Sequence, residues 1–238
     1  MITKKIIITS LIALCFINTK AQFFRGIGAF VGVTQTAHKY KNTLDVDSFF
    51  FAHTIPAPSH HSTEYFSWSA GILAEFLKYD HIRWQTELEY CNKGAVEHPL
   101  ITPWPITKGG RTVNKLSYIQ WNNFAKIFLR EGYRGFPYIM LGARIEYNLI
   151  RSAGAYGAVI GDLPKFNFSP DAAVGYEFSV YSKFKPFIEY HYNPDVITHH
   201  TDPVKFRSRT FELRVGVIWR PKKDLDDCNA PRYYGSDY

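Results

Sequence analysis

Cysteine is scarce in this chain, whose 238 residues include only Cys15, Cys91 and Cys228. A small secreted domain that depends on disulfides would carry more cysteines than this. Cys15 lies in an N-terminal segment that we expect to be removed. The strand pattern described below puts Cys91 and Cys228 at opposite ends of the fold, too far apart for a disulfide. The sequence therefore argues against a disulfide-stabilised scaffold.

Long apolar runs are also missing from most of the chain. Ile6–Ile17 is an apolar run near the N-terminus, but it is shorter than the ~20 residues that a membrane-spanning helix needs. No later stretch approaches that length. The sequence therefore gives no sign of a bundle of membrane helices.

The excess of positive charge is small once the N-terminal segment is set aside. The formal net charge is +7, and Lys4, Lys5 and Lys20 fall within the first 21 residues, so the remaining 217 residues carry +4. This mild positive charge does not indicate a nucleic-acid partner. A chain of this length fits a single domain.

The N-terminus has the three parts of a secretory signal peptide. Lys4 and Lys5 precede the apolar run, and Thr19-Lys20-Ala21 ends in a small residue where a signal peptidase cleaves. We expect residues 1–21 to be a signal peptide, cleaved between Ala21 and Gln22. The protein is therefore predicted to be exported.

The remaining chain shows about eight segments that alternate apolar and polar residues, joined by connections that alternate between long and short. The long connections are Ala37–Thr63, Gly94–Thr112, Arg151–Lys165 and Pro194–Lys205, and the short ones are Lys78–Asp80, Arg130–Arg134 and Ser182–Lys183. Barrels of the bacterial outer membrane have short periplasmic turns and longer outer loops. The pattern predicts an all-β, antiparallel, eight-stranded transmembrane up-and-down β-barrel over residues 22–220, with four extracellular loops.

Alternation along a strand assigns its side chains to two faces. In Ile82–Tyr90, Ile139–Tyr147, Ala172–Val180 and Phe211–Trp219, one face is compatible with lipid. The four noisier segments are Phe24–Thr34, Phe66–Phe76, Lys115–Leu129 and Phe187–Asn193. The aromatic content would suit either a soluble sandwich core or the girdles of a membrane barrel.

The opposite faces carry charged residues that would all point the same way. A soluble sandwich would place them in solvent, whereas a closed eight-stranded barrel would place them in a lumen just wide enough for side chains. Buried charges must pair or hold water, so we expect a paired, hydrated plug and no open pore. The predicted lumen network is Glu75, Arg83, Glu87, Glu89, Lys126, Arg144, Glu146, Glu177, Glu189, Glu212 and Arg214.

Three segments resemble the PorT-type family of outer-membrane β-barrels. They are WQTELEYCNKGA at Trp84–Ala95, LSYIQWNNFAKIFL at Leu116–Leu129 and YIMLGARIEYNL at Tyr138–Leu149. The resemblance implies a barrel in the bacterial outer membrane. Because the family's named member is associated with protein secretion across that membrane, it also implies outer-membrane lipid and components of a secretion machine as partners. It carries over no catalytic residue.

Two clusters of loop residues suggest other chemistry. If their loops met at the barrel rim, histidines and acids could bind a divalent metal, and the last loop alone could form a hydrolytic acid–histidine pair. Neither cluster has fixed ligand spacing or a recognisable nucleophile, so we expect no catalytic, cofactor or metal residues. The residues concerned are His53, His60, His61 and Glu64 in the first loop, and Asp195, His199, His200 and Asp202 in the last.

The sequence favours a non-enzymatic outer-membrane barrel that serves as a scaffold or as an accessory of a secretion or envelope system. One alternative is a protein whose extracellular loops bind a ligand, glycan or metal. A second is a barrel-embedded lipid-modifying enzyme or protease. Residues 221–238 lack strand alternation, so we expect a flexible periplasmic tail, with a docking segment as the alternative.

Overall fold

The structure is a computed structural model. It describes residues 24–42, 59–77, 79, 81–98, 100–101, 107–108, 110–129, 135–178, 183–194, 199–201 and 204–221. The predicted signal peptide with its Ala21–Gln22 cleavage site, and nearly all of the 221–238 tail, lie outside these residues.

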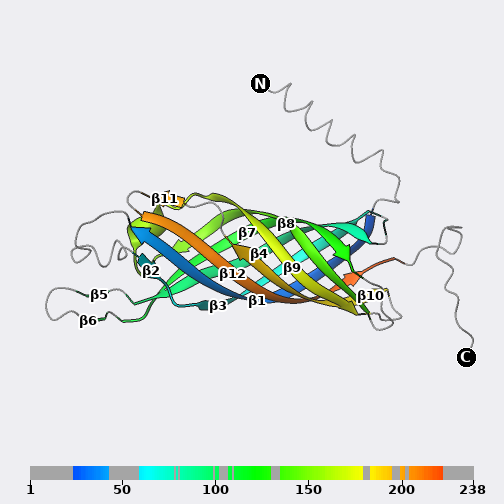
Figure 1. The fold of residues 1–238 in the computed structure, drawn as a ribbon, viewed down its shortest axis with the longest axis horizontal. Coiled ribbons are helices and arrows are strands. Elements are labelled where there is room, and N and C mark those ends of the chain that lie inside the picture. The colour runs from blue at the N-terminus through cyan, green and yellow to red at the C-terminus, as the bar shows by residue number, and fades with distance from the viewer. Residues whose placement is uncertain are drawn as a thin grey trace, which may run out of the picture.

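Eight long antiparallel strands form a closed ring (Figure 1). The ring runs β12-β10-β9-β8-β7-β4-β3-β1, and pairing of β1 with β12 closes it. This arrangement confirms the predicted all-β, up-and-down, eight-stranded barrel. The strands are β1 (Phe24–Asn42), β3 (Tyr65–Phe76), β4 (Ile82–Glu97), β7 (Thr112–Phe128), β8 (Gly135–Ser152), β9 (Phe166–Phe178), β10 (Phe184–Pro194) and β12 (Val204–Trp219).

Side chains alternate between the outer wall and the lumen along each long strand. On β12, for example, Val215 is exposed and Arg214 is buried, and the register pairs Val215 with Val31 of β1. Such alternation follows from the two-residue period of a strand. Exposed apolar and aromatic residues occur on all eight long strands. Soluble monomers rarely expose so large a continuous apolar surface, which argues against the soluble sandwich.

Polar groups on this apolar wall satisfy one another. Trp121 of β7 lies on the wall, and its indole N–H donates to the Thr86 hydroxyl on β4 at 2.9 Å. Thr86 in turn donates to the Asn122 carbonyl at 3.3 Å. Unsatisfied polar groups are costly in an apolar environment, so these contacts make a threonine compatible with the wall.

The two ends of the barrel differ. β1 begins and β12 ends at one end, where the short connections lie, and the long connections lie at the other end (Figure 1). Four short strands fall within the long connections: β2 (Ser59–His61) pairs with β1, β11 (His199–Thr201) with β12, and β5 (Leu100–Ile101) with β6 (Thr107–Lys108). The predicted first and second loops start too early, because β1 and β4 continue to Asn42 and Glu97.

The third long connection, predicted as a polar loop at Arg151–Lys165, is instead a folded cap. It contains the short helix α2 (Gly157–Gly161), which follows Tyr156 in a left-handed conformation at φ 56°. Its apolar side chains are buried against residues at the top of the lumen. This cap cluster comprises Ala155, Tyr156, Val159, Ile160 and Leu163, packed with Tyr40, Leu116, Tyr118, Val204 and Phe206.

Two inward-facing glycines make room for aromatic rings in the part of the lumen nearer the short turns. A Cβ at Gly175 would lie 2.4 Å from the Tyr138 ring, and one at Gly216 would lie 2.4 Å from the Phe187 ring. Any larger residue would force these rings to shift.

Among the described residues, no helix is long and apolar enough to cross a membrane.

Candidate functional site: a charged lumen beneath an apolar cap

The part of the lumen nearest the short turns is held by a cluster of ion pairs around Glu75. Its carboxylate lies 2.6 Å from Arg220 Nη2, 3.1 Å from Lys126 Nζ and 3.5 Å from Arg83 Nη1. Glu177 shares the same three bases, and Arg220 donates to it at 2.7 Å. Lys126 also lies 4.0 Å from the Tyr138 ring centroid. Two acids and three bases therefore form one connected set of ion pairs at this level.

The middle of the lumen is organised by two fully buried arginines, Arg144 of β8 and Arg214 of β12. Arg214 binds Glu87 at 2.8 Å, Glu89 at 2.6 Å and Glu212 at 2.8 Å. Its guanidinium carbon lies 4.5 Å from the Phe30 ring centroid. The acids come from two strands, so Arg214 links β4 to β12 across the lumen.

Arg144 shares Glu212 with Arg214, at 3.2 Å, and its Nε contacts the Asp171 carboxylate. It also donates to the Gln120 side-chain carbonyl at 3.0 Å. A buried guanidinium requires this many acceptors because desolvation of a charge is expensive. Arg144 thus connects three strands, β7, β9 and β12, to its own.

A chain of hydrogen bonds leads from Arg144 toward the ion pairs around Glu75, which we call the lower cluster. His191 lies between two carboxylates, with Nδ1 3.0 Å from Asp171 and Nε2 3.1 Å from Glu189. Glu189 then accepts from the Tyr138 hydroxyl at 2.7 Å. The lower and middle clusters are therefore parts of one continuous polar network.

Toward the long connections the lumen becomes mostly apolar, although His38 and Glu97 are also buried there. Lys93 binds Glu146 at 2.6 Å and donates to Asn193 at 3.3 Å. The cap begins above this pair, and the Asn114 side-chain carbonyl holds it by accepting from the backbone N–H groups of Gly154 and Ala155, at 2.8 and 2.9 Å. The cap therefore packs over inward-facing residues of β1, β7 and β12 at the end of the lumen that faces the long connections.

The surroundings of the cap tyrosine disfavour its ionised form. Burial, together with the nearby Glu97 carboxylate, raises the pKa of Tyr156 to about 12. Its hydroxyl is neutral at pH 7 in any case, and the shift extends the neutral form to more alkaline pH.

The structure buries all eleven residues of the predicted lumen network and joins them across strands. Reasoning from sequence missed Lys93, Asp171, His191 and Arg220 as members. His191 lies two positions after Glu189 in the predicted strand Phe187–Asn193 and so shares its face, but an ordinary histidine is largely neutral at pH 7 and was not included. Lys93, Asp171 and Arg220 lie just beyond the ends of the predicted strands, so the alternation of inward and outward side chains was not extended to them.

The cap was also missed, although the sequence contains a signal for it. Tyr156, Val159, Ile160 and Leu163 follow the i, i+3, i+4, i+7 spacing of an apolar helix face. Within a polar stretch this spacing covers only two turns, which made a loop the simpler prediction. Regular spacing in a long barrel loop indicates a segment that folds back onto the lumen.

The loop clusters considered for metal or hydrolytic chemistry are only partly visible. His53, Asp195 and Asp202 lie outside the described residues. Within the described part of the chain, no group of three or more His, Cys, Asp or Glu side chains could hold a metal ion. Most of the buried lumen acids lie within ion-pair distance of an arginine or lysine, and Glu189 lies beside His191.

Comparisons with known proteins find similar solved structures but assign the chain to no family. No family model matches the chain, and no curated protein matches it. Solved structures similar to it include Neisserial surface protein A, at 16% identity and a TM-score of 0.40, covering 81% of this chain and 97% of that one. Outer membrane protein OprG from Pseudomonas aeruginosa has 9% identity and a TM-score of 0.49, covering 84% and 98%. The outer membrane protease OmpT from Escherichia coli has 9% identity and a TM-score of 0.43, covering 82% and 97%.

At these identities and TM-scores, the likeness decides nothing about activity, and the fold assignment rests on the strand topology of the chain itself. That topology defines the class: a closed eight-stranded antiparallel β-barrel with an apolar outer wall and a charged, filled interior. Such an interior can hold strands in register and block passage through the barrel.

Proposed function

We propose that the protein is a non-enzymatic barrel of the bacterial outer membrane with a closed lumen. The observation that carries this proposal is the combination of an apolar outer wall on all eight strands with an interior filled by ion pairs. A lipid bilayer supplies an apolar surrounding on every side of such a wall. Only paired charges make such an interior stable.

The proposal includes an orientation and a route. The signal-peptide pattern of residues 1–21 supports export, and both ends of the barrel-forming chain lie at the end with the short turns. In outer-membrane barrels these turns face the periplasm. We therefore place the cap and the long connections outside the cell and the 221–238 tail in the periplasm.

Within the envelope, we propose a scaffold or accessory role in a secretion or envelope system. The resemblance of Trp84–Ala95, Leu116–Leu129 and Tyr138–Leu149 to the PorT-type family supports it. A second candidate is binding of an external ligand by the long connections. The organisation of the outer end supports that candidate, because β2 and β11 extend the barrel wall there and α2 closes the lumen.

The closed lumen gives a direct test of the proposal. Purified full-length protein in a planar lipid bilayer should show little or no steady conductance, because side chains nearly fill the interior of an eight-stranded barrel and the charges in this one are paired. Single-channel recording under a range of voltages would measure this. A large, stable conductance would contradict the proposal and indicate an open or oligomeric pore.

A cap variant separates two ways of blocking the lumen. Ile160→Ser should loosen the cap, since Ile160 is fully buried in the cap cluster. Conductance should nevertheless stay low, because the arginine and glutamate network lies below. A channel that opens in the Ile160→Ser variant would show that the cap alone closes the barrel.

A further inference from the structure

The outer wall formed by β1 and β12 changes from apolar to basic toward the end with the long connections. On both strands the outward side chains are mostly apolar toward the end with the short turns. They are basic at the two or three positions nearest the long connections. On β1 they are Ile27, Ala29, Val31, Val33, Gln35, Ala37, Lys39 and Lys41, and on β12, in the same direction, Trp219, Val217, Val215, Leu213, Phe211, Arg209, Arg207 and Lys205. We call Lys39, Lys41, Lys205, Arg207 and Arg209 the basic patch.

The strand register places like charges of the basic patch directly opposite each other. Lys39 pairs with Arg207, and Lys41 pairs with Lys205. Like charges at directly opposed positions destabilise a sheet. Over the described residues, the outward faces of β1 and β12 carry these five bases and no acid. The patch is therefore a concentration of positive charge that attracts an anionic group approaching this face.

An aromatic step separates the apolar wall from the basic patch. Phe211 is stacked with Tyr192 and Tyr190 of β10, at centroid distances of 5.0 and 6.0 Å. The guanidinium carbon of Arg209 lies 5.4 Å from the Phe211 ring centroid. Aromatic rings gather where a bilayer meets water, so the order apolar, aromatic, basic matches acyl chain, interface and headgroup.

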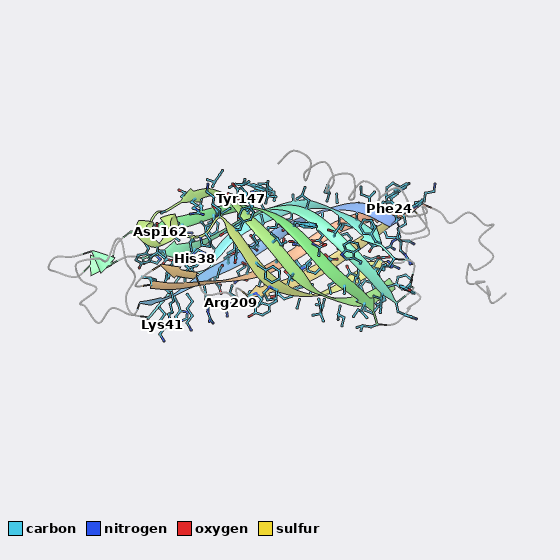
Figure 2. The ribbon with its side chains drawn as sticks, turned by 90° about the horizontal axis from the view of Figure 1, so that it is seen from above. Phe24, His38, Lys41, Tyr147, Asp162 and Arg209 are labelled. Atoms are coloured by element: carbon cyan, nitrogen blue, oxygen red, sulfur yellow. The ribbon has the colours of Figure 1, made fainter. Side chains whose placement is uncertain are left out.

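We propose that the basic patch binds the phosphate groups of a lipid in the outer leaflet, whose acyl chains lie along the apolar wall of β1 and β12. The inference rests on the proposed membrane placement. Guanidinium groups bind phosphate in a bidentate manner and lysines add point charges. Figure 2 shows Lys41 and Arg209 on the same side of the barrel, toward the end away from Phe24.

A lipid fits this surface better than a soluble anion does. The apolar wall runs directly below the basic patch on the same two strands, so one molecule with chains and phosphates can cover both. A soluble anion would use the patch alone. The two sources of phosphate can therefore be separated by experiment.

The same end of the barrel offers a matched control. Lys115 of β7 and Lys165 before β9 are both exposed. Lys115 stands opposite Gly94 and Ser152, without a second base in the register. A Lys115→Gln/Lys165→Gln protein removes two positive charges from this end and leaves the basic patch intact.

The test uses full-length protein in phosphatidylcholine nanodiscs titrated with diphosphorylated lipid A, with bound lipid counted by native mass spectrometry. Each Lys or Arg near an anionic surface contributes about a fivefold factor in affinity. Lys41→Gln/Lys205→Gln should therefore weaken lipid A binding by about 30-fold. The Lys115→Gln/Lys165→Gln control should bind as the unmodified protein does. Equal binding by the two variants would overturn the inference.

Two further probes identify the source of the phosphate. Dephosphorylated lipid A should bind the unmodified protein no better than phosphatidylcholine does. Inositol hexakisphosphate, a soluble polyphosphate, should bind only weakly, and binding as tight as that of lipid A would overturn the assignment to a lipid.

Insertion and stability are read separately. A protein that fails to insert into nanodiscs contradicts the proposed function, whereas an inserted protein indifferent to lipid A contradicts this inference alone. In zwitterionic detergent without lipid A, Lys41→Gln/Lys205→Gln should melt at the same temperature as the unmodified protein or higher, because two directly opposed like charges are gone. A lower melting temperature would contradict the argument that these opposed charges repel each other.

Discussion

Replacing Arg144 with methionine should destabilise the barrel by about 3–5 kcal/mol, the usual cost of removing one partner from a buried ion pair. Arg144 is fully buried and contacts Asp171, Glu212 and Gln120. Methionine keeps much of the volume but leaves the two carboxylates without this partner. Guanidinium unfolding in lipid vesicles, followed by heat-modifiable migration on gels, would measure the loss.

Two further variants separate charge from volume. Neutralising a stranded acid in Arg144→Met/Glu212→Gln should recover part of the loss, and the two substitutions should be clearly non-additive, because the two groups interact directly. Arg111→Met, at an exposed position, should change stability by less than about 0.5 kcal/mol. A small, additive effect of Arg144→Met would contradict the description of the lumen as a paired network.

An arginine introduced at Val31 or Val215 should cost roughly 2–4 kcal/mol, the value for a charge on the lipid face near the bilayer midplane. These residues pair across β1 and β12, and each lies in the middle of the apolar part of its strand. The charged side chain would have to be desolvated or pull water into the acyl region. The same vesicle unfolding experiment measures the cost.

The matched control uses the same face of the same strand. Gln35 lies four residues beyond Val31, at the upper edge of the apolar wall, where Phe211 is its partner. Gln35→Arg should cost about 0–1 kcal/mol, because the penalty falls near the interface. Equal costs at positions 31 and 35 would reject a bilayer around this wall.

The faces of the strands could be predicted because alternation is a local property. Val215 and Arg214 differ by one position, and a strand places adjacent side chains on opposite faces whatever else surrounds it. The same reasoning gave the correct outward and inward sets even in β7, where Asn123 interrupts the apolar face. A local rule therefore carried most of the fold.

Partners across the lumen could not be predicted, because they depend on how the strands are staggered around the closed ring. Arg214 binds Glu87, 127 positions earlier in the chain, and Arg220 binds Glu75, 145 positions earlier. Sequence alternation shows that these groups point inward but not at which height each one lies. The predicted network holds seven acids and four bases, and adding the missed Asp171, Lys93 and Arg220 gives eight acids and six bases, so the excess of acids falls from three to two.

The most direct test of a membrane-embedded barrel uses the tryptophans of its outer wall. Trp121 lies between Leu88 and Ile145 in the middle of the wall, whereas Trp219 lies at the end where β12 stops. Both are exposed on the barrel surface. Each can be kept as the single tryptophan of a full-length variant, with the others, including Trp104, replaced by phenylalanine.

Fluorescence of these two variants should be measured in vesicles whose lipids carry bromine at defined depths. Our account predicts that Trp121 is quenched most by bromine deep in the acyl chains and Trp219 most by bromine near the headgroups. If neither tryptophan responds to brominated lipid, and both are quenched instead by iodide in the water, the barrel does not span a membrane.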